Sequence, residues 1–375
     1  MSEELVMLRD AAAGLLAEKA PVAELRRLRD SRDPQGYSLS LWREMSDMGW
    51  TGMAIPEAYG GLDYGYTGLG LVLEQMGRNL SVSPLQSSIL VCATALVRMG
   101  SEAQKESLLP ALAAGELTMA LALQEGNHHA PEQTAMTATA DGDTLVLQGR
   151  KCLVFDGHTA DKLLVVVRTA GVPCDPDGLS LVIVDREAEG VAVERVIMLD
   201  SRNSATVSFD GVRVTADAVV GQRDQAAPGL EAVLDIANIG LSAELLGLST
   251  EAFQRTMDYL KERKQFGAAI GSFQALQHRA AEMYAQLELA RSIVIKALNA
   301  VDEGAEGISA LASGCKAKLC EVSNLVACEA IQMHGGIGMT DEFDIGFFLK
   351  RARVAQHSYG DYNYHLDRFA RLNGY

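Results

Sequence analysis

The stretch FQALQHRAAEMYAQLELARSIVIKA, residues 273–297, carries the clearest periodicity in the chain. Its apolar side chains recur in alternating steps of three and four residues, which places them along one face of an α-helix. They are Phe273, Leu276, Ala280, Met283, Leu287, Ala290, Val294 and Ala297. A face of this kind is typical of a seam between packed helices. We therefore expect a long helix here that packs against other helices.

The sequence on either side of this stretch is also helical in character. One helix is predicted from about residue 230 to 264, another from about 309 to 334, and a terminal one from about 344. Together with 273–297, these segments predict a four-helix bundle over residues 226–375.

Strand-like patterns precede the predicted bundle. Short β-branched runs lie between turn residues from about 134 to 220, and the turn Asp141-Gly142-Asp143 comes directly before one of them. The run 206–214 is expected to form two strand pieces joined by Asp210-Gly211. These features predict a middle antiparallel β-barrel domain at residues 118–225.

The remaining residues, 1–117, have helical patterns. Helices are predicted at 5–16, 22–30, 39–48, 69–80 and 87–99, and Ser101 with Gln104 predicts a capping box at the start of a further helix. The predicted fold class is therefore α+β, with an N-terminal helical domain, a middle β domain and a C-terminal four-helix bundle.

Composition narrows the function. The chain has 375 residues, long enough for a core that needs no disulfide or metal staple, and 33 basic against 49 acidic residues give a net charge of −16. Such a surface excludes nucleic acid and anionic membranes as partners, so an anionic ligand needs a local cationic site.

Six cysteines without CxxC spacing are expected to be buried in a reducing cytoplasm, and no metal site is predicted. We also expect no signal peptide and no membrane span.

Three segments could carry chemistry, and the first is YLKERKQFG, residues 259–267. Arg263 could bind a phosphate through two N–H groups, with Gln265 as a polar contact and Phe266 as a flat apolar face. Two other interpretations stay open. Basic residues late in a helix complement its dipole, and Arg263 could simply pair with Glu262 or Glu251.

The second segment is QMHGGIG, residues 332–338. Its glycines allow positive φ and close approach of the backbone to a ligand, whereas a helix end and turn would need only one of them. His128 and His129, which are adjacent in a predicted loop, are interpreted as polar loop residues rather than metal ligands.

The third segment is YGDYNYH, residues 359–365. Asp361 lies among aromatic residues, and a partly desolvated carboxylate is suited to accept a proton. The alternative is that Asp361 is the N-cap of a terminal helix that continues through Leu366 and Phe369.

The order of the three parts and the local motifs resemble the acyl-CoA dehydrogenase family over essentially the whole chain. Residues 49–61 (GWTGMAIPEAYGG) resemble its N-domain loop, 263–277 (RKQFGAAIGSFQALQ) its flavin-binding segment, and 332–338 its adenosine-side segment. This resemblance implies a flavin-dependent oxidoreductase of fatty acid or lipid metabolism.

The resemblance also implies FAD held at a subunit interface. Arg263 and Gln274 would contact the pyrophosphate and nearby groups, and Phe266 would line the dinucleotide. The adenosine part would be met from a neighbouring subunit by Gln332, Gly335 and Gly336. Implied partners are an acyl-CoA substrate, an acceptor like electron-transfer flavoprotein, and further subunits in a homotetramer or a heterotetramer with a homologous chain.

Two segments depart from the family pattern. Residues 124–131 read QEGNHHAP where the family has Thr-Glu-Pro followed by Gly-Ser-Asp, and 151–155 read KCLVF where it has Lys-x-Trp-Ile-Thr. The glutamate that follows a tyrosine in many members is Gly360 here, after Tyr359, and Asp361 comes next. The alternative family position for a glutamate falls near Ala237, with Asp235 and Asn238 beside it.

Three functions remain open at this point. The first is FAD-dependent α,β-dehydrogenation of an acyl-CoA thioester, in which Asp361 removes the α-proton while the β-hydride moves to flavin N5. The second is a non-catalytic or half-site subunit of a heteromeric acyl-CoA dehydrogenase. The third is a relative that uses the same scaffold for oxygen-dependent chemistry.

Overall fold

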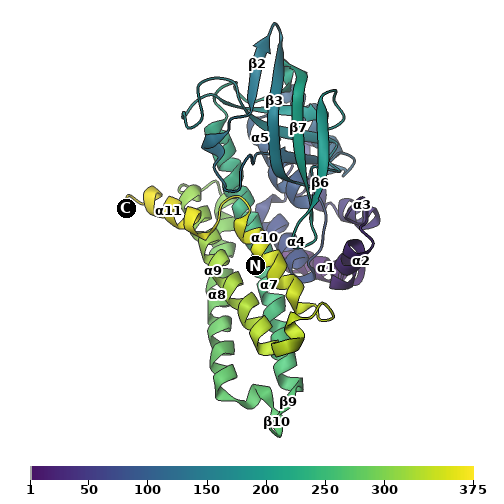
Figure 1. Ribbon diagram of the computed structural model, residues 1–375, viewed down its shortest axis with the longest axis vertical. Helices are drawn as coiled ribbons and strands as arrows, with labels where there is room; N and C mark the ends of the chain where they lie inside the picture. Colours follow the sequence, from purple (N-terminus) through teal and green to yellow (C-terminus); the bar gives the residue numbers. More distant parts are fainter. Residues whose placement is uncertain (1) are drawn as a thin grey trace. The chain divides into compact units, whose positions relative to one another are not determined.

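The computed structural model describes residues 2–375, which pack into two compact units (Figure 1). The first unit consists of residues 2–32, 66–82 and 238–375, and the second of 33–65 and 83–237. Helix α7 (Ala227–Glu262) supplies its first eleven residues to the second unit and the rest to the first. These units group the chain by packing, and the three-part division at 117/118 and 225/226 stays a prediction.

The first unit is helical and contains the predicted bundle. Figure 1 shows α8 and α9 running alongside each other. Its helices besides α7 are α1 (Glu3–Lys19), α2 (Val22–Asp30), α4 (Gly65–Asn79), α8 (Gln274–Asp302), α9 (Ile308–His334), α10 (Ile345–His357) and α11 (Tyr362–Leu372). The periodic face of α8 is buried as predicted, at Met283, Leu287, Ala290, Val294 and Ala297.

The single terminal helix predicted from about residue 344 is wrong, because the structure has two helices, α10 and α11. The alternative that Asp361 is the N-cap of a terminal helix is confirmed. Helices α10 and α11 are separated by Ser358–Asp361, where Tyr359 and Gly360 have φ values of 55° and 105°. Two successive residues with positive φ cannot continue a right-handed helix, so the chain turns before α11 begins.

The second unit contains the predicted sheet. It has the strands β1 (Met119–Ala122), β2 (Thr137–Asp141), β3 (Thr144–Phe155), β4 (Lys162–Arg168), β5 (Leu179–Asp185), β6 (Val191–Ile197), β7 (Asn203–Thr215) and β8 (Val219–Val220). The order is β6-β7-β3-β2-β4-β5-β8, with β1 beside β4. The strand pairs are antiparallel except that β4 pairs in parallel with β1 and, at one position, with β2.

The two strand pieces predicted over 206–214 are in fact one strand, β7. Leu147 of β3 pairs with Val212, and the next residue, Gln148, pairs with Asp210. Gly211, with φ 67°, is therefore the extra residue of a β-bulge, and its N–H donates to the Gln148 side chain over 3.0 Å. The Asp-Gly pair bends one strand instead of joining two.

Four helices of the second unit precede its first strand along the chain. They are α3 (Leu39–Asp47), η3 (Leu85–Ala93), α5 (Thr94–Met99) and α6 (Glu102–Ala113). The α-helix predicted at 87–99 is partly wrong, since η3 is a nine-residue π-helix that becomes α-helical only at Thr94. The capping box of Ser101 and Gln104 at the start of α6 is confirmed.

The burial of the cysteines and of helix α7 bears on two of the expectations from the sequence. Cys174 and Cys328 are exposed rather than buried, whereas Cys92, Cys315 and Cys320 are buried as expected. Helix α7 is long and apolar enough to cross a membrane by length and composition, and 94% of its most apolar window is buried within the protein. A window buried to this extent is typical of a core helix.

Candidate active site

A hairpin at one end of the helical unit presents Phe266. Strands β9 (Lys264–Gln265) and β10 (Ala268–Ala269) follow α7 directly, and Figure 1 shows them at the end of the long helices. The turn between them consists of Phe266 and Gly267, with φ values of 54° and 80°. Phe266 is thus a bulky residue in a strained conformation, and its side chain is 94% exposed. Both features are typical of a side chain held for contact with another molecule.

Arg263 lies beside this hairpin with its guanidinium free. Its main chain closes the last turn of α7 and accepts a hydrogen bond from the Ile270 N–H over 2.8 Å. The side chain is exposed and forms no hydrogen bond or ion pair within residues 2–375. The pairing with Glu251 is wrong, because that carboxylate binds Arg78 and Arg255 at 2.9 and 3.0 Å. Arg263 is therefore available to bind an anion.

The glycine segment lies at the same end of the unit. Helix α9 ends at His334, whose ring stacks on Tyr259 of α7 with centroids 4.4 Å apart. The Tyr259 hydroxyl also donates to the His334 carbonyl over 3.3 Å. A Cβ built on Gly335 or Gly336 would meet nothing within 4 Å, so this backbone faces open space. The last turns of α7 and α9 thus place Arg263 and the glycines on a common end.

The other predicted cofactor residues lie at this end too. Gln274 is the first residue of α8, and the preceding Phe273 has its ring 6.3 Å from that of Phe266 in an edge-to-face arrangement. Gln332 is exposed in the last turn of α9, and the Gln265 side chain donates to the Lys264 carbonyl over 2.7 Å. The structure therefore brings the predicted cofactor residues together, namely Arg263, Gln265, Phe266, Gln274, Gln332, Gly335 and Gly336.

Asp361 does not lie at this end. It is the N-cap of α11, and its Oδ1 accepts a hydrogen bond from the Tyr364 N–H over 2.9 Å, an interaction that does not involve Oδ2. The preceding carbonyl, that of Gly360, contacts Lys316 in the first half of α9. The stretch of α9 from Lys316 to His334 is about 27 Å long, so the candidate base and the cofactor end are well separated within one chain.

The sequence did not single out Lys316, nor did it show that Lys316, Asn238 and His365 meet at the turn before Asp361. Lys316 is completely buried on α9, and Asn238 of α7 and His365 of α11 are also buried. The signal was a lysine in the middle of an apolar helix face, next to the buried residues Cys315 and Leu319. A buried lysine at such a position needs polar partners, which marks it for attention.

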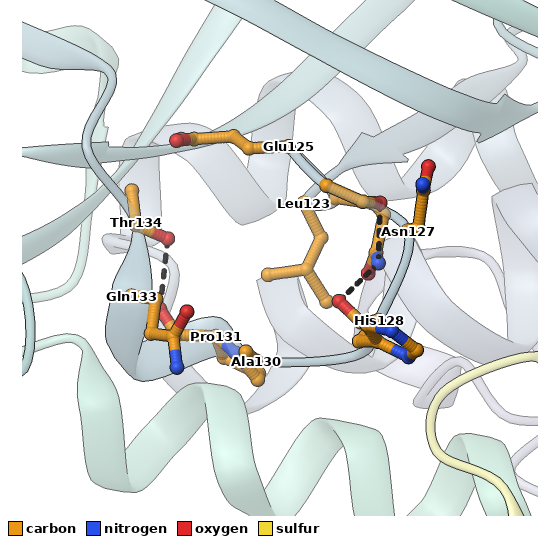
Figure 2. A pocket seen from close by; sticks show the side chains of 10 residues that line it. Leu123, Glu125, Asn127, His128, Ala130, Pro131, Gln133 and Thr134 are labelled. Atoms are coloured by element: carbon orange, nitrogen blue, oxygen red, sulfur yellow. Dashed lines mark hydrogen bonds between the residues drawn. The ribbon is translucent and has the colours of Figure 1, made fainter.

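A cavity of about 400 Å³ lies in the second unit, at the loop where the sequence departs from the family pattern (Figure 2). Its lining residues all lie between Leu123 and Thr134. The side-chain amide of Gln124 donates to the carbonyls of Gly126 and His128, and the Thr134 hydroxyl donates to the Pro131 carbonyl over 2.8 Å. The loop is therefore folded on itself around the cavity.

An ion pair between a buried lysine and a partly buried glutamate holds this loop. Lys151 Nζ lies 2.6 Å from Glu125 Oε1, and the same carboxylate accepts hydrogen bonds from the N–H groups of Ala135 and Met136. Burial lowers the pKa of Lys151 to about 8, and the charge of Glu125 opposes that decrease. The pair therefore fixes both ends of the loop that lines the cavity.

The second departing segment, 151–155, contacts the first. The pairing of β3 with β7 shifts register between Lys151 and Val154, and Leu153 has φ 51° with 40% of its surface exposed. The Cys152 N–H donates to the Gln124 carbonyl over 2.7 Å. A β-bulge thus presents Leu153 where the family motif has an aromatic residue, next to the altered loop.

Profiles of three protein domains match almost the whole chain. They are the N-terminal, middle and C-terminal domains of acyl-CoA dehydrogenase, over residues 2–116, 120–212 and 230–372. The chain belongs to the acyl-CoA dehydrogenase family. This confirms the resemblance and the fold class, and it identifies the chain as a flavin-dependent acyl-CoA dehydrogenase, an oxidoreductase of lipid metabolism.

Several individual acyl-CoA dehydrogenases are similar to this chain over nearly its full length. Mitochondrial isovaleryl-CoA dehydrogenase of Pongo abelii is 32% identical over 94% of this chain and 85% of its own. Acyl-CoA dehydrogenase FadE12 of Mycobacterium tuberculosis is 31% identical over 95% of this chain and 92% of its own. The solved structure of a variant of the Tcur3481–Tcur3483 steroid ACAD has a TM-score of 0.88 and 30% identity, over 99% of this chain and 98% of that one.

Proposed function

We propose that this acyl-CoA dehydrogenase binds FAD through the end of its helical unit and uses Asp361 to remove the α-proton of an acyl-CoA thioester. The observation that supports the cofactor site best is the exposed pair of Arg263 and Phe266. An unpaired guanidinium suits a pyrophosphate, and an exposed, strained aromatic ring suits a flat dinucleotide. When bound, FAD supplies the acceptor for the hydride that leaves the β-carbon.

The residues at the β9–β10 end of the helical unit would contact different parts of FAD. Arg263 would bind the pyrophosphate through two N–H groups, and Gln265, Gln274 and Gln332 would donate or accept around it. Gly335 and Gly336 would let the adenosine part approach the backbone, since a Cβ built at either position meets no other part of residues 2–375 within 4 Å. These roles provide the local positive charge and contact surface that a chain of net charge −16 needs for an anionic ligand.

Asp361 would act at the substrate. Its Oδ2, which the helix cap does not use, would accept the α-proton of the thioester. The distance of about 27 Å along α9 separates this carboxylate from the Arg263 end of the same chain, more than one pyrophosphate and its own flavin ring would span. We therefore expect Arg263 and Asp361 of one chain to serve two different cofactors, so that each FAD lies between subunits.

Purified protein tests this function directly. We expect it to be yellow, to release FAD on denaturation, and to lose its flavin colour under anaerobic conditions when mixed with its substrate. Suitable thioesters are isovaleryl-CoA, butyryl-CoA and a CoA thioester of a steroid acid, chosen from the names of similar proteins, and octanoyl-CoA as a longer straight chain. A colourless protein that takes up no added FAD, alone or with a homologous chain, would contradict the proposal.

A half-site subunit is the second candidate function. Gly360 occupies the glutamate position of the family motif, and the neighbouring carboxylate of Asp361 caps a helix. The similar steroid ACAD is named for two proteins, Tcur3481 and Tcur3483. Flavin content and activity with and without a co-expressed homologous chain separate the two functions. Activity that appears only with the second chain favours the half-site.

Assembly is a further expectation. Exposed apolar side chains recur on α8, at Tyr284, Leu289 and Ile295, while its opposite face is buried in the bundle. Because oligomers normally close with symmetry, we expect a dimer or a tetramer built from dimers, as a homotetramer or a heterotetramer. Light scattering of the yellow protein is the measurement, and a stable monomer that retains FAD would refute this expectation.

The surroundings of the enzyme follow from the same proposal. We expect a cytoplasmic location and reoxidation by an acceptor like electron-transfer flavoprotein. The net charge of −16 argues against binding to nucleic acid or to an anionic membrane.

A further inference from the structure

A completely buried lysine holds the chain just before Asp361. Lys316 Nζ donates to the Ser358 carbonyl over 2.6 Å, to the Gly360 carbonyl over 3.1 Å and to Asn238 Oδ1 over 3.3 Å. An ammonium has three N–H groups, so all of them are used. None of these three acceptors is a carboxylate. The buried charge is therefore compensated by two main-chain carbonyls and one amide.

The carbonyl of Tyr359, which lies between those of Ser358 and Gly360 in the chain, is also bound by side chains. Tyr359 O accepts a hydrogen bond from Asn238 Nδ2 over 3.2 Å and lies 3.0 Å from His365 Nε2. Three consecutive carbonyls, from Ser358 to Gly360, are thus fixed by side chains of α7, α9 and α11. A dense set of contacts of this kind is what a strained backbone requires in order to persist.

The backbone of this turn is strained. Tyr359 has φ 55°, which is uncommon for a bulky residue, and Gly360 has φ 105°. A Cβ at Gly360 would lie 2.4 Å from Tyr364 Cδ1 and 2.8 Å from His365 Nε2. The turn therefore needs glycine at 360, and the buried donors hold its carbonyls in place.

From this geometry we infer that Lys316 is a positioning residue, which holds the Ser358–Gly360 turn so that the Asp361 carboxylate is aimed at the substrate. The inference rests on the proposed function of Asp361. Capping of a helix does not explain the arrangement by itself, because α1 and α3 are capped by Ser2 and Ser38 through a single side-chain acceptor.

The charges of the two groups are coupled. Burial lowers the pKa of Lys316 to about 8, and Cys320, Asp361 and Cys315 act in the opposite direction. The Asp361 carboxylate thus favours the charged form of Lys316, and the two residues are connected through the hydrogen bond from Lys316 to the Gly360 carbonyl. This coupling agrees with a lysine that acts through the turn on the candidate base.

The variant Lys316→Met tests the inference, because methionine has a similar length and no donors. The matched control is Lys318→Met, on the same helix, whose Nζ binds Gln286 and Glu321 at the surface. Amide hydrogen exchange over residues 357–364 is the first measurement and needs no substrate. We expect faster exchange there in Lys316→Met, with FAD content unchanged, and wild-type exchange in the control.

Flavin reduction is the second measurement, with the thioester that bleaches the wild-type protein fastest. We expect the rate constant to fall about 100-fold in Lys316→Met, with little change in the half-saturating concentration, since the base is misplaced while binding is kept. In an Asp361→Asn background the same substitution should cause no further loss, because Lys316 acts through Asp361. Equal losses in both backgrounds would show a structural role only and overturn the inference.

A second variant, Asn238→Asp, tests the inference independently in case Lys316→Met folds poorly. Asn238→Asp keeps an acceptor for Lys316 but removes the N–H that binds Tyr359 O. We expect faster exchange in the turn and a smaller loss of rate. Exchange and rate both equal to wild type would overturn the inference. A wild-type flavin that no thioester bleaches, together with a loosened turn in the variants, would instead overturn the function proposed for Asp361.

Discussion

The Asp361→Asn variant should keep its fold and its FAD, while flavin reduction by acyl-CoA becomes roughly 10²–10⁴-fold slower. Asparagine and aspartate cap helices about equally well, so the contact from the Tyr364 N–H to Oδ1 is retained. The amide cannot accept the α-proton, however. Stopped-flow measurement of flavin absorbance under anaerobic conditions, with thermal unfolding as the control for stability, gives both quantities.

Rapid bleaching in Asp361→Asn would remove Asp361 as the base. The remaining candidates would then be Asp235, which lies near the second family position on α7, or a carboxylate of a neighbouring subunit. Asp235→Asn is the matched comparison. Gly360→Glu, which would restore the usual family residue, is a poor test because φ at 360 is 105° and a Cβ there would meet Tyr364 and His365.

Removal of the Arg263 guanidinium has the second largest expected effect. Arg263→Ala should weaken FAD retention by about 1.5–3 kcal/mol, the usual contribution of a hydrogen bond to a charged group. That corresponds to roughly a 10- to 150-fold higher dissociation constant. Thermal stability of the cofactor-free protein should change little, because the side chain has no partner within residues 2–375. Fluorescence of released FAD during dilution measures the retention.

Lys261→Ala is the control for this substitution. Lys261 is exposed at the same helix end, and its ammonium lies 3.7 Å from Asp258. It removes one positive charge without touching the proposed phosphate contact. If both variants lose FAD equally, general charge rather than a built site explains retention. If neither does, the pyrophosphate is bound elsewhere.

The sequence predicted best the features that depend on regularly spaced apolar residues. The helix at 22–30 has the predicted bounds, and the periodic face of 273–297 is buried where the spacing required. Local features that depend on a partner were predicted wrongly. The bulge at Gly211 is set by the register against β3. The start of α11 was predicted only as an alternative, with Asp361 as its N-cap, and the structure confirms that alternative.

The same distinction applies to the candidate site. Arg263, Gln265 and Phe266 are neighbours in sequence, so a motif can point to them. The acceptors of Lys316 lie about forty residues further along the chain or far before it, and only the fold brings them together. Lys151 is similar, since its partner Glu125 is on a separate loop. A lysine within an apolar pattern indicates a buried charge, but the sequence does not show which residues will bind it.

The interleaving of the two packing units has a consequence for synthesis on the ribosome. The second unit is complete once residue 237 has been made, whereas the first unit needs residues up to 375. Helix α2 shows this clearly, because Arg26 and Arg29 bind Asp341. Helices α1 and α2 therefore leave the ribosome long before their C-terminal partners, and their apolar faces need protection from aggregation until those helices are made.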